Sequence, residues 1–467
     1  MRLVMIKKSI KIKNFDYYIA YIGYILVALF IMRLILLDPG TIGFFHDWSI
    51  GPYPEMNNVF TGSAFYIWDE QYGNKPFPTD WLTRVALYLP FSFLGGEVLS
   101  KGFLVSVLAL SGFTSYCLGR RLKLSSYSSF AVGVLYIFSP VVFTRIVAGY
   151  IWYLVAYLLT PLILTVYLMG RTKNKIKYFL ICGILIAFGI SQIQFLVIIF
   201  LILIIFSLID FGNIRKNMLR LLVIFSIAFM ITLFPIMLAQ TLKGPDANAS
   251  FRPSQLLSFH LVLNAADLLK SFRLLGYDPN PYSYGNLYRD GIIPPFIFYL
   301  DFLLPIIGFS TLLFKRDKYT ISFATISLLG LFLLKGLNPP FADVFKNLFL
   351  AGFYIFREIW HIALLYSFSI TFLAAFFLEK LRFIRISNFL KLPLSLILIS
   401  LVVISNGYPL LIGTFGSYVQ TFNYPEEAHN IYKTFSLNNT YNILLLPFIA
   451  PIKYDGLKHE IPANSKK

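Results

Sequence analysis

Apolar runs of about 20 residues recur along the 467-residue chain, and short segments rich in lysine and arginine lie between many of them. A helix of that length spans the ~30 Å hydrocarbon core of a bilayer. The composition agrees, because 57% of the residues are hydrophobic and only 13% are charged. Strands of an outer-membrane barrel would instead alternate in ~10-residue segments. The sequence therefore predicts an all-α, multi-spanning membrane protein.

The first apolar run, Tyr17 to Leu37, is too long for the core of a signal peptide. No small-residue cleavage site follows it. We expect it to remain as the first membrane anchor.

The net charge of +18 indicates orientation and not a nucleic-acid partner. Six short segments hold 22 Lys or Arg and only four acidic residues, which accounts for the whole excess. By the positive-inside rule, short basic loops stay in the cytoplasm. We therefore place these segments inside the cell: 1–16, 119–124, 171–177, 210–220, 315–318 and 379–391.

The same charge pattern predicts the number of spans. Residues 178–210 are a 33-residue apolar run with basic residues at both ends. As one helix it would be about 50 Å long, so we expect two short helices that turn near Ser191-Gln192. Likewise, 125–170 is expected to hold two spans with a turn around Pro140 to Gly149. With the other runs at 17–37, 102–118, 219–239, 293–313, 319–334, 359–378 and 392–411, this makes about eleven spans in a multi-pass cell-membrane protein whose N-terminus is cytoplasmic and whose C-terminus is extracytoplasmic.

Two regions follow from this topology. Residues 1–411 are expected to form the transmembrane domain, and residues 412–467 an outer tail that could begin a truncated soluble domain. Within the first outer loop, Asn58 to Asp69 and Leu82 to Leu94 are expected to be amphipathic surface helices. Ile443 to Phe448 reads as a strand of the tail.

The first outer loop, Asp38 to about Trp81, is the most unusual soluble segment. It contains the string FFHDW and has a single base, Lys75. A membrane protein that collects carboxylates just outside its first helix is more typical of an enzyme than of a channel. The acidic residues are Asp38, Asp47, Glu55, Asp69, Glu70 and Asp80.

Several chemistries are excluded by the absence of their motifs. The sequence has no glycine-rich phosphate loop, no G-x-S-x-G and no H-E-x-x-H. Cys117 and Cys182 both fall inside predicted spans, where core packing explains them. No metal site or cofactor is predicted, although a divalent metal stays open. The enzyme that remains is one whose substrate is already activated.

A sugar on polyprenyl phosphate meets that requirement, because nucleotide sugars and ATP are generally absent outside the cell. Its transfer needs a carboxylate that takes the proton of the acceptor hydroxyl, and a cation that meets the charge on the departing phosphate. Asp47 is the candidate base. Arg357 is the candidate cation, because its planar fork matches phosphate oxygens.

Short motifs give the chain a resemblance to a known class. They are FFHDW followed by P-x-P, W-D-E-Q-Y-G-N-K-P-F-P at 68–78, F-S-P at 138–140, G-L-N-P-P-F with F-R-E-I-W-H at 336–361, and Y-P-E-E-A-H-N-I-Y in the tail. In these it resembles the GT-C class of polytopic glycosyltransferases, and more narrowly the membrane portion of arabinofuranosyltransferase D-like prokaryotic proteins. The resemblance covers most of residues 15–450.

The resemblance implies a GT-C-like bundle that transfers a sugar from polyprenyl phosphate to an outer glycan or lipid acceptor. It also implies that Asp47 is the acidic residue of the first outer loop. Such relatives continue into β-rich or carbohydrate-binding outer domains, whereas this sequence ends at Lys467. The choice of acceptor is therefore left open.

Each residue of the first loop also has a plainer interpretation. Asp47 fits a catalytic base and a solvated or helix-capping carboxylate about equally well. His46 could bind phosphate or tune Asp47, and an exposed loop histidine explains it at least as well. Asp69 and Glu70 are secondary acidic candidates, because neighbours on a helix diverge by about 100°. Asp38 is expected to end the first span.

A second group of candidates lies near the start of the span 359–378. Arg357 and His361 are four residues apart and would share a helix face with Glu358, as a donor-phosphate site or as a headgroup anchor. Arg145 is expected in an outer turn, where snorkelling to the headgroups is favoured over contact with a lipid phosphate. Asp301 falls inside a span and needs a partner or a cavity.

Two other functions stay open. A lipid or polysaccharide transporter would be expected to have charged residues along its spans and two halves of similar sequence. In this chain the spans contain Arg33 and Asp301, and no internal repeat is visible. A non-catalytic subunit of a cell-envelope glycan assembly complex is the third possibility. In every case the partners include membrane lipids and exclude nucleic acid.

Overall fold

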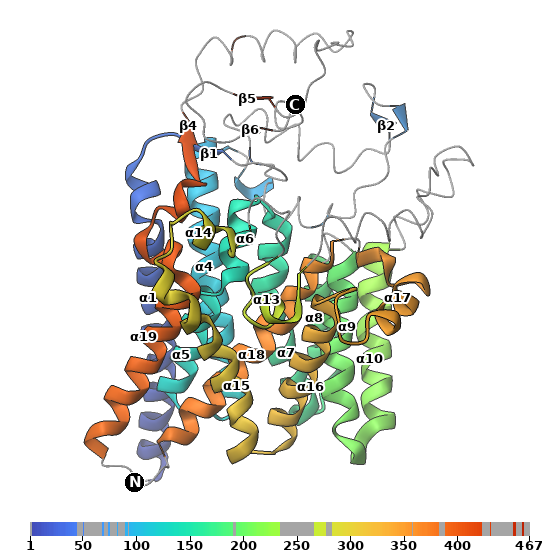
Figure 1. Ribbon diagram of the computed structural model, residues 1–467. Coiled ribbons are helices and arrows are strands. Elements are labelled where there is room, and N and C mark those ends of the chain that lie inside the picture. Colours follow the sequence, from blue (N-terminus) through green and yellow to red (C-terminus); the bar gives the residue numbers. More distant parts are fainter. Residues whose placement is uncertain are drawn as a thin grey trace.

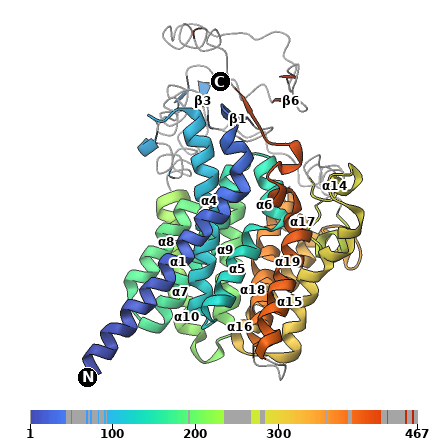
Figure 2. The same ribbon diagram turned by 90° about the vertical axis from the view of Figure 1, so that its left-hand side faces the viewer.

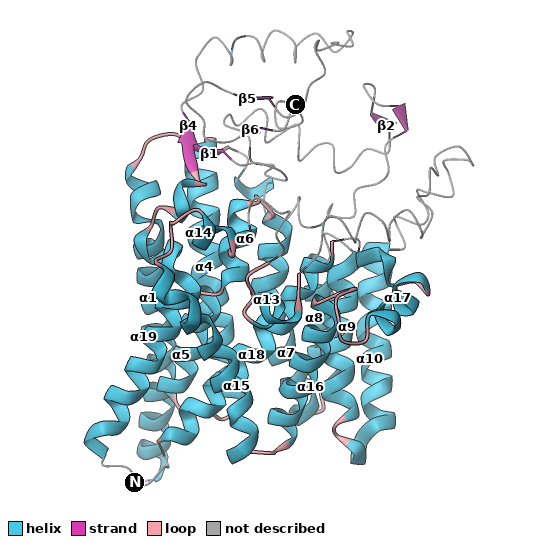
Figure 3. Cartoon of the chain, viewed as in Figure 1, coloured by secondary structure: helices cyan, strands magenta, loops and turns pink. Residues whose placement is uncertain are grey.

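The computed structural model describes a helical bundle with short strands at one end (Figure 3). It describes residues 2–43, 50, 68–69, 73–74, 82, 89–91, 93–189, 193–233, 266–276, 283–356, 358–382, 388–422, 430, 452–453 and 460–461. Among these, only the backbone is described at 2–14, 68–69, 73–74, 89, 211, 233, 354, 388–390, 452–453 and 460–461.

Helices make up nearly all of the described chain. The α-helices are α1 (Arg2–Leu37), α4 (Gly96–Arg121), α5 (Ser126–Ile137), α6 (Pro140–Val147), α7 (Ile151–Lys173), α8 (Ile176–Gly189), α9 (Ile193–Leu208), α10 (Ile214–Ala228), α13 (Leu268–Phe272), α14 (Asn286–Arg289), α15 (Leu303–Phe314), α16 (Lys318–Leu334), α17 (Ala342–Leu350), α18 (Ala363–Leu381) and α19 (Asn388–Ile412). The 3-10 helices are η1 (Leu89–Phe91), η2 (Phe211–Asn213), η5 (Pro295–Phe302), η6 (Phe353–Phe356), η7 (Ile359–Ile362) and η8 (Phe415–Ser417), and η3 (Phe229–Leu233) is a π-helical turn.

The predicted membrane class is confirmed. In the described residues, seven helices are long and apolar enough to cross a bilayer: Phe15–Leu37, Gly96–Arg121, Ser126–Val147, Ile151–Lys173, Pro295–Phe314, Ile359–Leu381 and Lys391–Ile412. Three shorter apolar helices, α8, α9 and α16, coincide with further expected spans. The expected span 219–239 begins in α10 and η3. The total of about eleven spans remains a prediction.

Two helices occupy the middle of the bundle. Helix α4 packs against α1, α5 and α7, and the almost fully buried α18 packs against α5, α15 and α16 (Figures 1 and 2). Helices α1, α4 and α5 approach closely at Tyr24 of α1. Gly112 of α4 and Gly133 of α5 face the ring of Tyr24, and a Cβ at either glycine would collide with it. Tyr24 then donates a hydrogen bond to the carbonyl of Phe130 at 2.9 Å. Small residues at such crossings are typical of membrane bundles.

The six basic segments meet at one end of the bundle, which we call the basic end. Side-chain contacts connect neighbouring segments in turn, so all six lie on one side. The N-terminus lies at the same end (Figure 1). These contacts are Asp16 with Ser126, Ser125 with Glu379, Arg121 with Thr172, Arg171 with Asp210, Lys318 with Asp210, and Arg220 with Asn174.

The expected division of the long apolar runs is confirmed in part. The run 178–210 forms two helices, α8 and α9, and the turn expected at Ser191-Gln192 lies outside the described residues. The run 125–170 divides into two spans as expected, Ser126–Val147 and Ile151–Lys173, and the turn is narrower than expected because Pro140–Val147 is helix α6. Ser139 caps this helix through the backbone N–H of Val141, and proline is well suited to its first position. The chain reverses after Val147, at Gly149 with φ +72°.

The charges inside two spans have structural partners. Arg33 of α1 donates to the carbonyls of Leu411 and Ile412, both at 2.9 Å, and so binds the carboxyl end of α19. Asp301 is buried in η5 with its Oδ2 3.2 Å from Nη2 of Arg273.

Tyr288 donates to the same oxygen of Asp301 at 2.6 Å. Burial and the negative charge of Asp301 raise the pKa of Tyr288, which therefore stays a proton donor at neutral pH. Of the two interpretations of Asp301, pairing is the one that the geometry supports.

Short strands join outer segments at the end opposite the basic end. Strand β1 (Thr41–Gly43) pairs antiparallel with β4 (Gln420–Phe422), which joins the start of the first outer loop to the tail. The hydroxyl of Thr421 also donates to Asp38, which follows the last residue of α1 as expected. The remaining pair at the tail is β5 (Ile452–Lys453) with β6 (Glu460–Ile461).

The surface helices expected in the first loop can be compared with the structure at only a few residues, of which Leu82 is helical as expected. Trp68–Asp69 is a strand, β2, which pairs with β3 (Gly73–Asn74) and does not end a helix. The span Leu82 to Leu94 contains the 3-10 turn η1 near its end. Most of both segments lies outside the described residues, as does the strand expected at Ile443 to Phe448.

The gathering of basic segments predicts the sidedness of the bundle. Gly95, before α4, and Gly212, in η2, lie at opposite ends, and a Cβ at either position meets no atom within 4 Å. In intact cells, an impermeant thiol reagent should label Gly95→Cys and not Gly212→Cys, and both should label after lysis. The unmodified chain controls for Cys117 and Cys182. Labelling of Gly212→Cys but not of Gly95→Cys in intact cells would show that the basic end faces outward, which contradicts the predicted topology.

The buried pair of Arg273 and Asp301 predicts a large and coupled effect on stability. Asp301→Asn should lower the free energy of unfolding by about 3–5 kcal/mol, because it leaves the guanidinium buried without a counter-ion. The double variant Arg273→Met with Asp301→Leu should recover much of that loss. Denaturant unfolding in mixed micelles measures both. Additive losses would show that the two side chains do not depend on each other.

Candidate functional site

The structure describes two of the predicted site residues in full. Those are Glu358 and His361, while Asp69 has only its backbone described, in β2. His46, Asp47, Glu70 and Arg357 lie outside the described residues, so their predicted roles stay predictions. The described residues on either side of the FFHDW segment are Gly43 and Ile50. Gly43 ends strand β1, which lies at the end opposite the basic end, and Ile50 is buried in the core.

Glu358 and His361 meet, but not on an α-helix. Glu358 has φ −97° and ψ 88° and precedes the 3-10 turn η7, so the shared α-helical face expected for Arg357, Glu358 and His361 is wrong. In a 3-10 turn residues three apart are aligned, which brings His361 onto Glu358. Nδ1 of His361 lies 2.9 Å from the carbonyl oxygen of Glu358 and 3.6 Å from its Oε2.

Two tyrosines from the start of α7 complete the surroundings of this pair. Tyr150 donates its hydroxyl to Oε2 of Glu358 at 3.1 Å. The ring centroids of Tyr150 and Tyr153 lie 6.0 and 5.9 Å from that of His361. Phe195 of α9 packs on the histidine as well, at 5.7 Å. His361 is consequently buried, with 3% of its surface exposed.

Arg145 is the unexpected member of the site. It projects from α6 with 1% of its surface exposed, and its Cζ lies 4.6 Å from the ring centroid of Tyr150 and 4.7 Å from that of Tyr153. Its Nε and Nη2 are buried and have no hydrogen-bond partner. No carboxylate in the described part of the chain forms an ion pair with it. The interpretation as a snorkelling surface residue is wrong, because α6 turns Arg145 into the bundle.

We call Arg145, Tyr150, Tyr153, Glu358 and His361 the arginine cluster. Its residues come from α6, from the turn into α7, and from the chain that leads into α18. The far ends of α7 and α18 reach the basic end, so the cluster lies at the opposite end of both helices.

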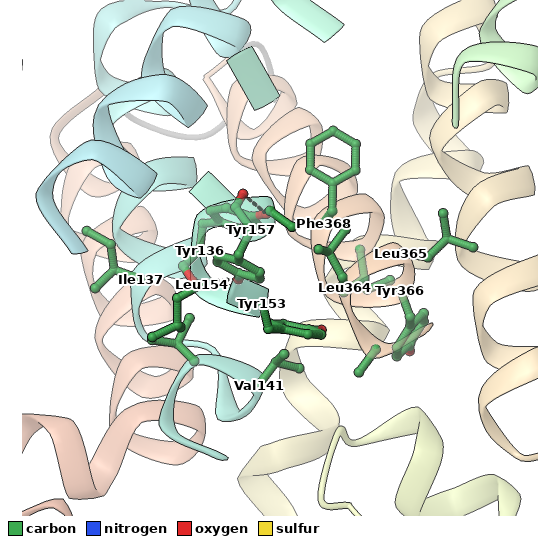
Figure 4. Close-up of a cluster of buried hydrophobic side chains, with 14 of the residues drawn as sticks. Tyr136, Ile137, Val141, Tyr153, Leu154, Tyr157, Leu364, Leu365, Tyr366 and Phe368 are labelled. Carbon is green, nitrogen blue, oxygen red and sulfur yellow. Dashed lines mark hydrogen bonds between the residues drawn. The ribbon is translucent and has the colours of Figure 1, made fainter. Parts of the chain in front are cut away.

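A rigid polar network beneath the cluster holds these helices together (Figure 4). Tyr136 of α5 and Tyr157 of α7 stack with their centroids 3.8 Å apart, and each donates its hydroxyl to the carbonyl of the other residue. Ser367 of α18 lies 2.8 Å from the hydroxyl of Ser139 and 3.2 Å from that of Tyr157. Because buried hydroxyls need partners, this network fixes the register of α5, α7 and α18.

The electrostatics of the cluster favour an anion. Removing a guanidinium from water costs several kcal/mol of hydration free energy. Cation–π contact with two tyrosine rings offsets about 2 kcal/mol of that cost. Glu358 is held by Tyr150 and His361 and makes no ion pair with Arg145. The planar guanidinium of Arg145, with its buried Nε and Nη2 unpartnered, matches the oxygens of a phosphate or carboxylate.

Other polar features are separate from the cluster. An outer cavity of about 290 Å³ lies beside Asp38 and the loop after α19, lined in part by Thr414, Ser417 and Gln420. Within the described residues, no group of three or more His, Cys, Asp or Glu side chains could hold a metal ion. Cys117 and Cys182 lie in α4 and α8, as expected for core packing.

Sequence reasoning named Arg145 but expected it in an exposed turn, and it missed Tyr150 and Tyr153, although a local signal was present. Ser139-Pro140 is a helix start, with a capping hydroxyl followed by proline at the first position. A helix started there places Arg145 on its last turn and the tyrosines on the next helix. Which side of α6 faces the bundle depends on packing and cannot be read from this pattern.

Comparison with known proteins gives no relative. No protein-family model matches the chain, and no curated protein matches it either. The resemblance to GT-C glycosyltransferases therefore stays a prediction. Function has to be inferred from the side chains that the bundle brings together.

Proposed function

We propose that this chain is an integral membrane glycosyltransferase of the GT-C type. It transfers a sugar from a polyprenyl-phosphate donor to a glycan or lipid acceptor on the extracytoplasmic side. The observation that supports this best is Arg145, a buried cation at the end opposite the basic end whose Nε and Nη2 have no hydrogen-bond partner. An anion that reaches this site from a membrane is most simply a lipid phosphate.

The proposed reaction assigns a task to each predicted residue. The acceptor hydroxyl oxygen attacks the anomeric carbon, the bond from that carbon to the phosphate oxygen breaks, and polyprenyl phosphate leaves. The carboxylate of Asp47 takes the hydroxyl proton. Arg145 binds the phosphate whose charge grows as the bond breaks, and Arg357 is a second cation for the same phosphate.

The remaining residues of the cluster position these groups. Glu358 accepts from Tyr150, whose ring lies against the Arg145 guanidinium, and so helps to hold that cation. His361 packs against the rings of Tyr150 and Tyr153, the same two tyrosines that Arg145 contacts. His46, Asp69 and Glu70 stay candidates for contacts with the donor or acceptor.

Replacement of Arg145 by lysine is the direct test of this role. Arg145→Lys keeps the charge and loses the planar fork, so turnover should fall by about 10²-fold, in line with the loss of a strong donor to the leaving group. The assay is purified protein in lipid nanodiscs with a polyprenyl-phosphate sugar, scored for release of polyprenyl phosphate.

Arg220→Lys is the matched control, because Arg220 lies at the basic end and pairs with Asn174 and Asn217. It should keep near-normal turnover. Equal losses in the two variants would mean that lysine at either position merely weakens the fold, and Arg145 would then have no special role.

Asp47→Asn tests the base. It keeps the size of the side chain and removes the proton acceptor, so transfer should drop by about 10²–10⁴-fold while donor binding persists. Asp343→Asn on the exposed face of α17 is the control and should leave transfer unchanged. Near-normal turnover of Asp47→Asn would shift the search for the base to Asp69 and Glu70.

The wild-type protein decides between the enzyme and its rivals. A protein that binds or moves polyprenyl-phosphate sugars across the membrane without breaking the glycosyl bond, for several sugars and acceptors, would be a transporter. One that only binds them would be a subunit of an assembly complex.

A further inference from the structure

Helix α17 has three distinct faces. Phe345 and Phe349 are fully buried against the protein. Phe341, Val344 and Leu348 form a second stripe at helical spacing, and 68%, 56% and 40% of their surfaces are exposed. The remaining side carries the polar residues Asp343, Lys346 and Asn347, together with Leu350, which is 41% exposed. A helix on the surface of a soluble protein needs only the first and third of these faces.

The position of α17 in the chain accounts for the second face. It follows α16, which coincides with an expected span, and it precedes the span Ile359–Leu381. The end of α16 and the start of the span Ile359–Leu381 both lie opposite the basic end, because Lys318 begins α16 and Lys380 is in the last turn of α18. A short helix between two membrane spans would lie at the boundary of that leaflet, with protein on one side, lipid on the second and water on the third.

Aromatic contacts connect α17 to the arginine cluster. Phe345 contacts Phe353 of η6 at 6.3 Å between centroids, and Phe353 stacks on the buried Phe356 at 4.5 Å. Phe356 is two residues before Glu358 in the chain. Buried aromatic packing therefore connects α17 to the chain that leads to Glu358.

We propose that α17 is an in-plane membrane helix whose stripe of Phe341, Val344 and Leu348 contacts lipid hydrocarbon, and that the isoprenoid chain of the lipid donor lies against it. The second part rests on the proposed function. Such contact would place the phosphate of the donor at headgroup depth, where the arginine cluster receives it. Helix α17 then selects for the lipid part of the substrate, and the cluster selects for its phosphate.

The membrane contact is tested without any assay of activity. Spin labels are attached at Val344→Cys and, as the matched control on nearly the opposite side of the helix, at Lys346→Cys, in protein reconstituted into liposomes, with Cys117 and Cys182 replaced by alanine. Collisions with oxygen should dominate for the label at 344, and collisions with a water-soluble nickel complex should dominate for the label at 346. Equal accessibility of both labels to the nickel complex, or no access of oxygen to 344, overturns the membrane contact.

The donor contact is tested by kinetics. Val344→Lys should raise the KM for a long-chain polyprenyl donor by about tenfold, which corresponds to the loss of one buried aliphatic side chain, and leave the KM for a short, water-soluble isoprenyl donor unchanged. Asp343→Lys places the same side chain on the polar side of the helix and should change neither. Thermal unfolding of the variants confirms that they fold.

The outcomes separate this inference from the proposed function. An unchanged KM for the long-chain donor in Val344→Lys, beside the expected spin-label pattern, would overturn the donor contact and leave the membrane contact. If the wild-type protein cleaves no polyprenyl-phosphate sugar, the proposed function and the donor contact both fail, and the spin labels still decide whether α17 lies in the membrane.

Discussion

The hydrocarbon of the bilayer is the constraint on which this structure depends. Backbone polar groups in hydrocarbon must be satisfied within the chain, which leaves helices as the form for these apolar runs. Charges are excluded from the same region, and here the excess of bases gathers at one end of the bundle through contacts such as Arg171 with Asp210. The opposite end is free to receive the loops, the strands β1 and β4, and the arginine cluster.

The buried cations of the bundle show which charges carry structure and which are available for function. Arg33 bonds to the carbonyls at the end of α19, Arg273 pairs with Asp301, and Lys101 pairs with Glu97 and the carbonyl of Asp38. Each of these cations has an oxygen partner, which offsets part of the free-energy cost of removing the charge from water. Arg145 differs, because two of its nitrogens are buried without one and its neighbours are tyrosine faces. A bound anion would remove that difference.

The sequence was most informative where one force dominates. Hydropathy and charge predicted a multi-pass helical protein, the division of 178–210 into two helices, and the end of α1 at Asp38, because each depends on length and polarity alone. The turn expected over 140–149 is narrower, because Ser139 and Pro140 start helix α6 and the chain reverses only at Gly149. The burial of Arg145 was missed for the same reason.

The site was less predictable than the fold. Glu358 and His361 do meet, yet through a 3-10 turn, and a spacing of residues cannot distinguish that from the α-helix that was expected. Their third neighbour, Tyr150, is more than 200 residues away in sequence. Such a contact depends on how α7 packs beside α18, and that packing is set by side chains such as Tyr157 and Ser367 throughout the core.

The most direct measurement of the central claim is an experimental density map of the protein in nanodiscs with polyprenyl phosphate. The account predicts that a phosphate oxygen lies about 3 Å from Nε or Nη2 of Arg145, with the isoprenoid chain leading away into the membrane. A phosphate bound elsewhere, with Arg145 paired to a carboxylate of the protein itself, would contradict the account.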